Sequence, residues 1–205
     1  MTEPPGGLAV EEADLGRVLT WPNAITVLRL CAIPVYVWLL FTTAHELAAG
    51  FLLGTLGVTD WVDGFVARRL HQVTTLGKVL DPIADRALVF TAVVTVALHG
   101  AVPWWFAGLS IARELVVSLA VVGLAAAGAA RIDVLWIGKA GTFGLLTAYP
   151  LLLMAHGPQG WQSVLHEVAW LIGWVGLMLA WFAAFAYLRP ARDALVRGRH
   201  GRELG

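Results

Sequence analysis

Six apolar stretches, each close to 20 residues long, constrain the fold of this chain more than any other feature of its sequence. They cover residues 23–42, 46–68, 80–99, 103–126, 134–155 and 164–188. A helix needs about 20 mostly apolar residues to cross the hydrocarbon core of a bilayer. The composition agrees, because 59% of the 205 residues are hydrophobic and only 14% are charged, against about a quarter charged in soluble domains. We therefore expect an all-α, polytopic membrane protein with six transmembrane helices.

The two ends of the chain differ from these stretches. Residues 1–7 are predicted to be disordered, and residues 8–19 mix apolar with charged side chains, which is typical of a short amphipathic helix on a membrane surface. The last residues form a basic tail. The sequence therefore predicts three parts, a tail with a surface helix over 1–20, a membrane domain over 21–188 and a basic cytoplasmic tail over 189–205.

Lysine and arginine residues fall on one side of the predicted membrane. With six spans, both ends and the second-to-third and fourth-to-fifth connections share a side, and these segments hold the cations flanking the spans. The opposite connections, near 43–46, 99–103 and 156–163, contain no Lys or Arg. Because positively charged loops stay in the cytoplasm, we predict a multi-pass protein of the inner or plasma membrane with both termini cytoplasmic. A formal net charge of zero gives no general affinity for nucleic acid, and none is expected as a partner.

Four carboxylates lie beside or inside the apolar segments, where an unpaired charge costs several kcal/mol. They are Asp60, Asp63, Asp81 and Asp85. Residues three or four apart share one face of a helix, so the four acids form two stripes that can meet across a helix pair. Two divalent cations would balance four negative charges, and all-oxygen ligation suits Mg²⁺, Mn²⁺ or Ca²⁺. The spacing therefore indicates a metal site at the cytoplasmic side.

Each stripe also offers room for a ligand. Gly64 and Gly77 lack the side chains that would block the approach to a metal, and Arg68 is a cation of the kind that binds phosphate oxygens. Metals, glycines and arginine together indicate a diphosphate site. The alternative is that the acids pair with Arg68, Arg69 and Arg86 at the membrane boundary and bind no ligand.

Residues 60–85 match D-x2-D-G-x2-A-R-x8-G-x3-D-x3-D without a gap, and this pattern resembles the signature of the CDP-alcohol phosphatidyltransferases. The resemblance implies an enzyme of phospholipid biosynthesis that transfers a phosphatidyl group from CDP-diacylglycerol to an alcohol and releases CMP. It implies one or two Mg²⁺ or Mn²⁺ ions held by the four acids, with Asp85 also acting as general base. The nucleotide diphosphate would contact a set of motif positions, namely Asp60, Gly64, Ala67, Arg68 and Gly77. Homodimers are common in this family, but the sequence does not decide the oligomeric state.

Three polar residues recur at every third position in the first apolar stretch. Asn23, Thr26 and Arg29 resemble an N-x2-T-x2-R pattern near the start of these enzymes, so we predict that they face the CDP-diacylglycerol site. Hydrogen bonding between helices is the alternative.

Two cations are candidates for binding the acceptor alcohol. Arg113 and Glu114 lie inside the fourth stretch, where adjacent side chains point about 100° apart and need not pair, so Arg113 could bind a phosphate. Lys139 starts the fifth stretch, with snorkelling to the interface as the alternative. The segments IARELVVS and LWIGKAGT resemble the bacterial phosphatidylglycerophosphate synthases, which implies glycerol 3-phosphate as the first choice of acceptor.

Departures from that pattern leave other acceptors open. An expected Arg-Glu pair reads Leu119-Ala120-Val121, and an expected Lys-x-Lys-Thr reads Lys139-Ala140-Gly141-Thr142. Fewer cations favour a more apolar acceptor, so phosphatidylglycerol, as in cardiolipin synthases, is an alternative, as are inositol phosphate and inositol. Outside this family, intramembrane acids also mark cation transporters, and an inactive scaffold is the remaining alternative.

Overall fold

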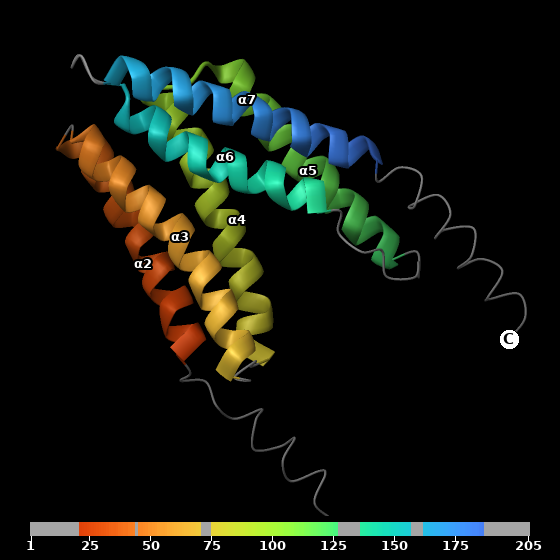
Figure 1. Ribbon diagram of the computed structural model, residues 1–205. Coiled ribbons are helices and arrows are strands. Elements are labelled where there is room, and N and C mark those ends of the chain that lie inside the picture. The colour runs from red at the N-terminus through yellow and green to blue at the C-terminus, as the bar shows by residue number, and fades with distance from the viewer. Residues whose placement is uncertain (1–20, 44, 71–74, 127–135, 157–161, 187–205) are drawn as a thin grey trace, which may run out of the picture. The chain divides into compact units, whose positions relative to one another are not determined.

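The computed structural model describes residues 21–43, 45–70, 75–126, 136–156 and 162–186, and for 21–22, 60–70, 75–79 and 125–126 it describes the helical backbone alone. The described residues form helices and no strand (Figure 1). The helices are α2 (Trp21–Thr42), α3 (Glu46–Leu70), α4 (Thr75–Leu98), α5 (Trp104–Ala126), α6 (Trp136–Met154) and α7 (Gln162–Ala186). Each predicted apolar stretch corresponds to one helix, which confirms the all-α fold. The predicted surface helix and the basic tail lie outside the described residues.

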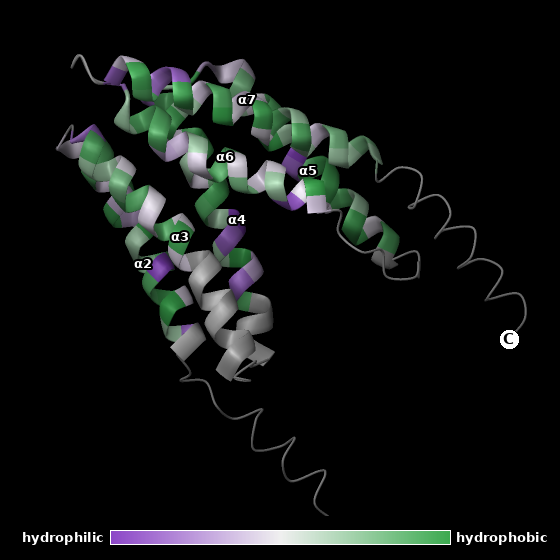
Figure 2. Cartoon of the chain, in the orientation of Figure 1, coloured by the Kyte–Doolittle hydropathy of each residue, from purple (hydrophilic) through white to green (hydrophobic). Residues whose placement is uncertain are grey.

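Among the residues whose side chains are described, four helical segments are long and apolar enough to cross a membrane. The qualifying segments are Asn23–Thr42, Trp104–Leu124, Trp136–Met154 and Gln162–Ala186. In α3 the part whose side chains are described, Glu46–Thr59, is a shorter apolar segment. Figure 2 shows hydrophobic colouring along most of α5 and α7 and hydrophilic bands within α2 and α4. The described structure therefore establishes a multi-helix membrane protein, and six crossings stay a prediction.

Helix α4 begins earlier than the hydropathy pattern predicts. It starts at Thr75 rather than at residue 80, so Asp81 and Pro82 lie inside the helix. Hydropathy does not mark the first turns because they carry Lys78 and Asp81 beside the apolar residues. As a result, Asp81 and Asp85 stand on consecutive turns of one continuous helix.

The chain divides into two compact units, Met1–Ala92 and Val93–Gly205. In the first unit, α2 packs along α3. The fully buried side chains of these two helices include Tyr36 and Leu40 from α2 and Ala49 and Leu53 from α3. This pairing presents the polar face of α2, with Asn23, Thr26 and Arg29 also buried, toward the interior of the unit.

In the second unit, α6 and α7 form the most extensive helix contact, and their backbones nearly touch. A Cβ atom on Gly141 would lie 2.5 Å from the backbone nitrogen of Ala180, and one on Gly176 would lie 2.9 Å from that of Leu145. Only glycine fits at such distances, and small residues are the usual means of close packing in membranes. Helix α5 joins this pair through Phe106, which is completely buried and packs edge-on against Trp170 at 5.1 Å between ring centroids.

Candidate active site

The two motif acids on α4 lie on one face of that helix, because four residues separate them. Asp81 is half-buried, and the side chain of Asp85 is 42% exposed. Both carboxylates receive a hydrogen bond from α2. Thr26 Oγ1 donates to Asp81 Oδ1 at 2.6 Å, and Arg29 Nη1 donates to Asp85 Oδ1 at 2.8 Å in an ion pair.

The donors on α2 are buried although the helix also faces outward. Thr26 and Arg29 are each 1% exposed, whereas Val27 and Leu28, between them, are 49% and 68% exposed. The two donors are three residues apart on α2 and the two acids are four residues apart on α4, so each donor contacts one acid. Asn23, one further step back, lies on the same buried face at 4% exposure.

The structure thus brings two of the three predicted N-x2-T-x2-R residues onto two of the four predicted acids. These contacts are hydrogen bonds between helices, which the sequence left open as the alternative to ligand binding. Their acceptors are two acids of the motif. The sequence signal that could have linked the polar residues of α2 to the acids of α4 is their spacing, because both sets repeat about once per helical turn. Their role in binding CDP-diacylglycerol stays a prediction.

The remaining motif positions are placed at the level of the backbone. Asp60, Asp63, Gly64, Ala67 and Arg68 lie on the second half of α3, which is helical through to Leu70. Gly77 lies in the first turn of α4. The side chains of these six positions lie outside the described part of the structure. The helical backbone nevertheless preserves the spacing that puts the acids of α3 on one stripe.

The chemistry of Asp81 and Asp85 fits a hard divalent cation. Carboxylate oxygens are the ligands that Mg²⁺ and Mn²⁺ prefer, and ligating carboxylates in metal sites are held in turn by hydrogen bonds from neighbouring groups. Here Thr26 and Arg29 provide such bonds. Arg29 already supplies one positive charge to Asp85 through their ion pair.

A second polar cluster is buried in the other compact unit, around Arg113 of α5. Its Nη1 donates to Glu114 Oε2 at 2.9 Å and to Thr142 Oγ1 at 3.0 Å. Its Nε and Nη2 donate to the backbone oxygens of Ala180 and Gly138, each at 3.4 Å. Arg113 is only 6% exposed. It therefore links α5 to both α6 and α7.

The sequence left open whether Arg113 and Glu114 pair with each other. Arg113 and Glu114 do pair, because the long arginine side chain spans the 100° between adjacent positions. Sequence reasoning missed Thr142 as a partner, although it stands at the end of the Lys139-Ala140-Gly141-Thr142 segment. Lys139 itself is exposed. Acceptor binding by Arg113 and Lys139 stays a prediction.

The chain is similar to known proteins over most of its length. Residues 19–182 match the family model described as CDP-alcohol phosphatidyltransferase. A cardiolipin synthase (CMP-forming) of Streptomyces coelicolor is 35% identical over 204 residues, 95% of this chain and 94% of the relative. A putative cardiolipin synthase of Mycobacterium tuberculosis H37Rv is 36% identical over 182 residues, 88% of this chain and 86% of the relative. A CDP-diacylglycerol–glycerol-3-phosphate 3-phosphatidyltransferase of Escherichia coli K12 is 34% identical over 181 residues, 85% of this chain and 96% of the relative.

Proposed function

Because the chain belongs to the CDP-alcohol phosphatidyltransferase family, we propose that it transfers a phosphatidyl group from CDP-diacylglycerol to an alcohol acceptor and releases CMP. The family makes it a membrane-embedded transferase of phospholipid biosynthesis, and this membership argues against the cation transporter and the inactive scaffold. The observation that carries the reaction is the motif of residues 60–85 on α3 and α4, of which Asp81 and Asp85 are tied to α2.

Members of the family use a divalent metal ion, and we assign its ligands here to Asp60, Asp63, Asp81 and Asp85. When bound, Mg²⁺ or Mn²⁺ would supply positive charge to the diphosphate of the substrate. Gly64, Ala67, Arg68 and Gly77 complete the proposed site for CDP-diacylglycerol.

We assign separate tasks to the residues of α2 and α4. Thr26 and Arg29 hold Asp81 and Asp85 in fixed orientations, so that little reorganisation is needed when substrate binds. Asp85 is half-exposed and takes the proton of the attacking acceptor hydroxyl, because a general base must lie within hydrogen-bond reach of that group. The bond that breaks joins the phosphatidyl phosphorus to the CMP oxygen, and CMP leaves.

We propose phosphatidylglycerol as the acceptor, which makes cardiolipin the product. The sequence alone put glycerol 3-phosphate first. Two observations now favour the lipid acceptor, the similarity over 95% of the chain to a cardiolipin synthase and the ion pair that already engages Arg113 with Glu114. A doubly charged phosphate would have to displace Glu114, and the expected additional cations are absent from 119–121 and 139–142. Glycerol 3-phosphate is the second candidate, supported by the E. coli relative.

The test is CMP release by the purified chain with CDP-diacylglycerol and Mn²⁺ or Mg²⁺, with each acceptor offered separately. We expect metal-dependent CMP release and a cardiolipin product with phosphatidylglycerol. Release with glycerol 3-phosphate alone would replace the acceptor but keep the reaction. No release with phosphatidylglycerol, glycerol 3-phosphate, inositol phosphate or inositol, from protein shown to be folded, would contradict the proposed reaction.

Asp85→Asn should abolish CMP release, because the amide keeps the shape of the side chain but cannot accept the hydroxyl proton. General base catalysis contributes about 10²–10⁴-fold to a rate, so the loss should be at least of that order. The control is Val27→Ala, an exposed position on α2, which should retain activity. Turnover near that of the wild type in a folded Asp85→Asn protein would overturn the assignment of the base.

A further inference from the structure

Two histidines of the second compact unit stand at the ends of helices that are separate in the chain. His99 directly follows α4, where the helix closes in a turn with Gly100 at a φ of 87°. The backbone nitrogen of Gly100 donates to Ala97 O and that of Ala101 to Val96 O, each at 3.1 Å. This is the hydrogen-bond pattern of a Schellman motif, and it fixes the backbone that carries His99.

His156 also follows a helix, because it is the second residue after α6, which ends at Met154. Its backbone nitrogen donates to Leu153 O at 3.2 Å, and that of Ala155 donates to Leu151 O at 2.9 Å. Both imidazoles therefore stand at helix C-termini, where carbonyl groups without helical partners concentrate partial negative charge. Such a position favours a cation.

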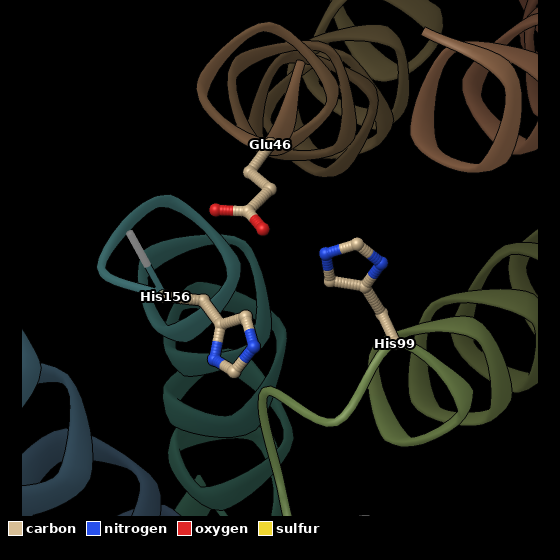
Figure 3. A group of neighbouring side chains, drawn as sticks. All are labelled: Glu46, His99 and His156. Atoms are coloured by element: carbon tan, nitrogen blue, oxygen red, sulfur yellow. The ribbon is translucent and has the colours of Figure 1, made fainter. Parts of the chain in front are cut away.

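The two imidazole rings lie next to each other (Figure 3). Their centroids are 5.5 Å apart with an angle of 66° between the ring planes, and a nitrogen of one lies within 4.8 Å of a nitrogen of the other. His99 is half-buried and His156 is exposed. Glu46, which Figure 3 also labels, belongs to the first compact unit and is no part of this pair.

We propose that His99 and His156 bind one divalent transition-metal ion of the Zn²⁺ class, which joins the ends of α4 and α6. Neutral imidazole suits Zn²⁺, Cu²⁺ or Ni²⁺, whereas carboxylate sites suit Mg²⁺ and Mn²⁺. Zinc–nitrogen bonds of about 2.0–2.1 Å in a tetrahedron bring two ligand nitrogens to about 3.4 Å. A small rotation of the exposed His156 side chain closes that difference, and water fills the remaining positions.

The surrounding sequence favours a cation at this place. The segments 99–103 and 156–163 contain no Lys or Arg that would repel it, and the distribution of Lys and Arg predicts that both lie on the side of the membrane opposite to the predicted catalytic motif. The ion would link two helix ends within the second unit. It would stabilise the fold of that unit, because the ion binds the folded arrangement in preference to the unfolded one. It takes no part in phosphatidyl transfer.

The test measures Zn²⁺ binding to the full-length chain without a histidine tag, in detergent, with a large excess of Mg²⁺ to occupy the carboxylate site. We expect one Zn²⁺ per chain in the wild type. His156→Ala and His99→Ala should each weaken Zn²⁺ binding by about tenfold or more, since loss of even an outer partner of a metal ligand costs 10–100-fold. The matched control is His166→Ala, because His166 lies in α7 and accepts the indole N–H of Trp170 at 3.0 Å.

Two further readouts separate a metal site from a simple ring contact. Cu²⁺ bound to the wild type should show imidazole nitrogen couplings by electron paramagnetic resonance, and these should disappear in His156→Ala. Zn²⁺ should raise the Tm of the wild type but not that of His156→Ala, whose CMP release without Zn²⁺ should equal that of the wild type. Unchanged Zn²⁺ binding in His156→Ala, or an equal loss in His166→Ala, would overturn the proposal.

Discussion

Arg29 is almost completely buried, yet its guanidinium carries a full positive charge. Its ion pair with Asp85 at 2.8 Å explains how that charge is tolerated, because a buried charge without a partner is strongly destabilising. The same contact orients Asp85, the proposed base. One residue therefore serves both the stability of α2 against α4 and the geometry of the site.

Arg29→Ala should lower the kcat of CMP release by about a hundredfold, the order of loss that follows when a catalytic group is displaced by about 1 Å. We expect a much smaller change in KM for the acceptor. Arg29→Lys should recover part of the activity, because it restores the positive charge without the geometry of the guanidinium. Steady-state kinetics on folded protein measure both, and full activity in Arg29→Ala would contradict the positioning role.

Thr26 tests the same idea at Asp81. Thr26→Val keeps the shape of the side chain but removes the hydroxyl that donates to Asp81 Oδ1. We expect it to raise the Mg²⁺ or Mn²⁺ concentration for half-maximal CMP release by about 10–100-fold, whereas Thr26→Ser should stay close to the wild type. Metal titrations of CMP release in the two variants test this expectation. Equal metal dependence in Thr26→Val and Thr26→Ser would exclude a role for this hydroxyl.

Spacing along a helix predicts which residues share a face, but not the partner that each one meets. The repeats of Asn23, Thr26 and Arg29 and of the motif acids were readable in the sequence. The pairing of Arg29 with Asp85 depends on how α2 lies against α4, which neither repeat contains. In the same way, the pairing of Arg113 with Glu114 depends on side-chain length and not on the angle between adjacent positions.

At the scale of the helices, the packing of α6 on α7 depends on glycine. Gly141→Ala would place a Cβ atom against the backbone of Ala180, and overpacking of this kind typically costs about 1–3 kcal/mol. We expect a lower Tm in detergent. The matched control is Gly123→Ala in α5, where a Cβ atom meets nothing within 4 Å, and its Tm should be unchanged or higher, since alanine favours helix. A Tm equal to that of the wild type in Gly141→Ala would show that the helices can separate at little cost.

Helix positions were predictable because each helix contains a long, mostly apolar stretch of the kind expected of a membrane-spanning segment. The ends of α5 and α6 fall within two residues of the sequence-based limits. The start of α4 did not follow hydropathy, because polar motif residues occupy its first turns. The polar motif residues therefore obscured the boundary of the helix that carries them.

At the scale of the whole molecule, the distribution of Lys and Arg predicts that both termini are cytoplasmic. In a Cys31→Ser background, which removes the exposed native thiol, a cysteine at His45 should react with a membrane-impermeant maleimide added to intact cells. A cysteine at Ala194, in the basic tail, should react only after the membrane is opened. The reverse pattern would invert the proposed orientation.

An enzyme that makes phospholipid changes the lipid composition of the bilayer around it. Two helices in lipid gain little from the hydrophobic effect, because acyl chains are as apolar as leucine side chains. The contact between Gly141 and Ala180 relies instead on steric fit between two main chains, which no lipid tail can enter. The fit between these two main chains therefore does not depend on which headgroups and acyl chains surround the helices.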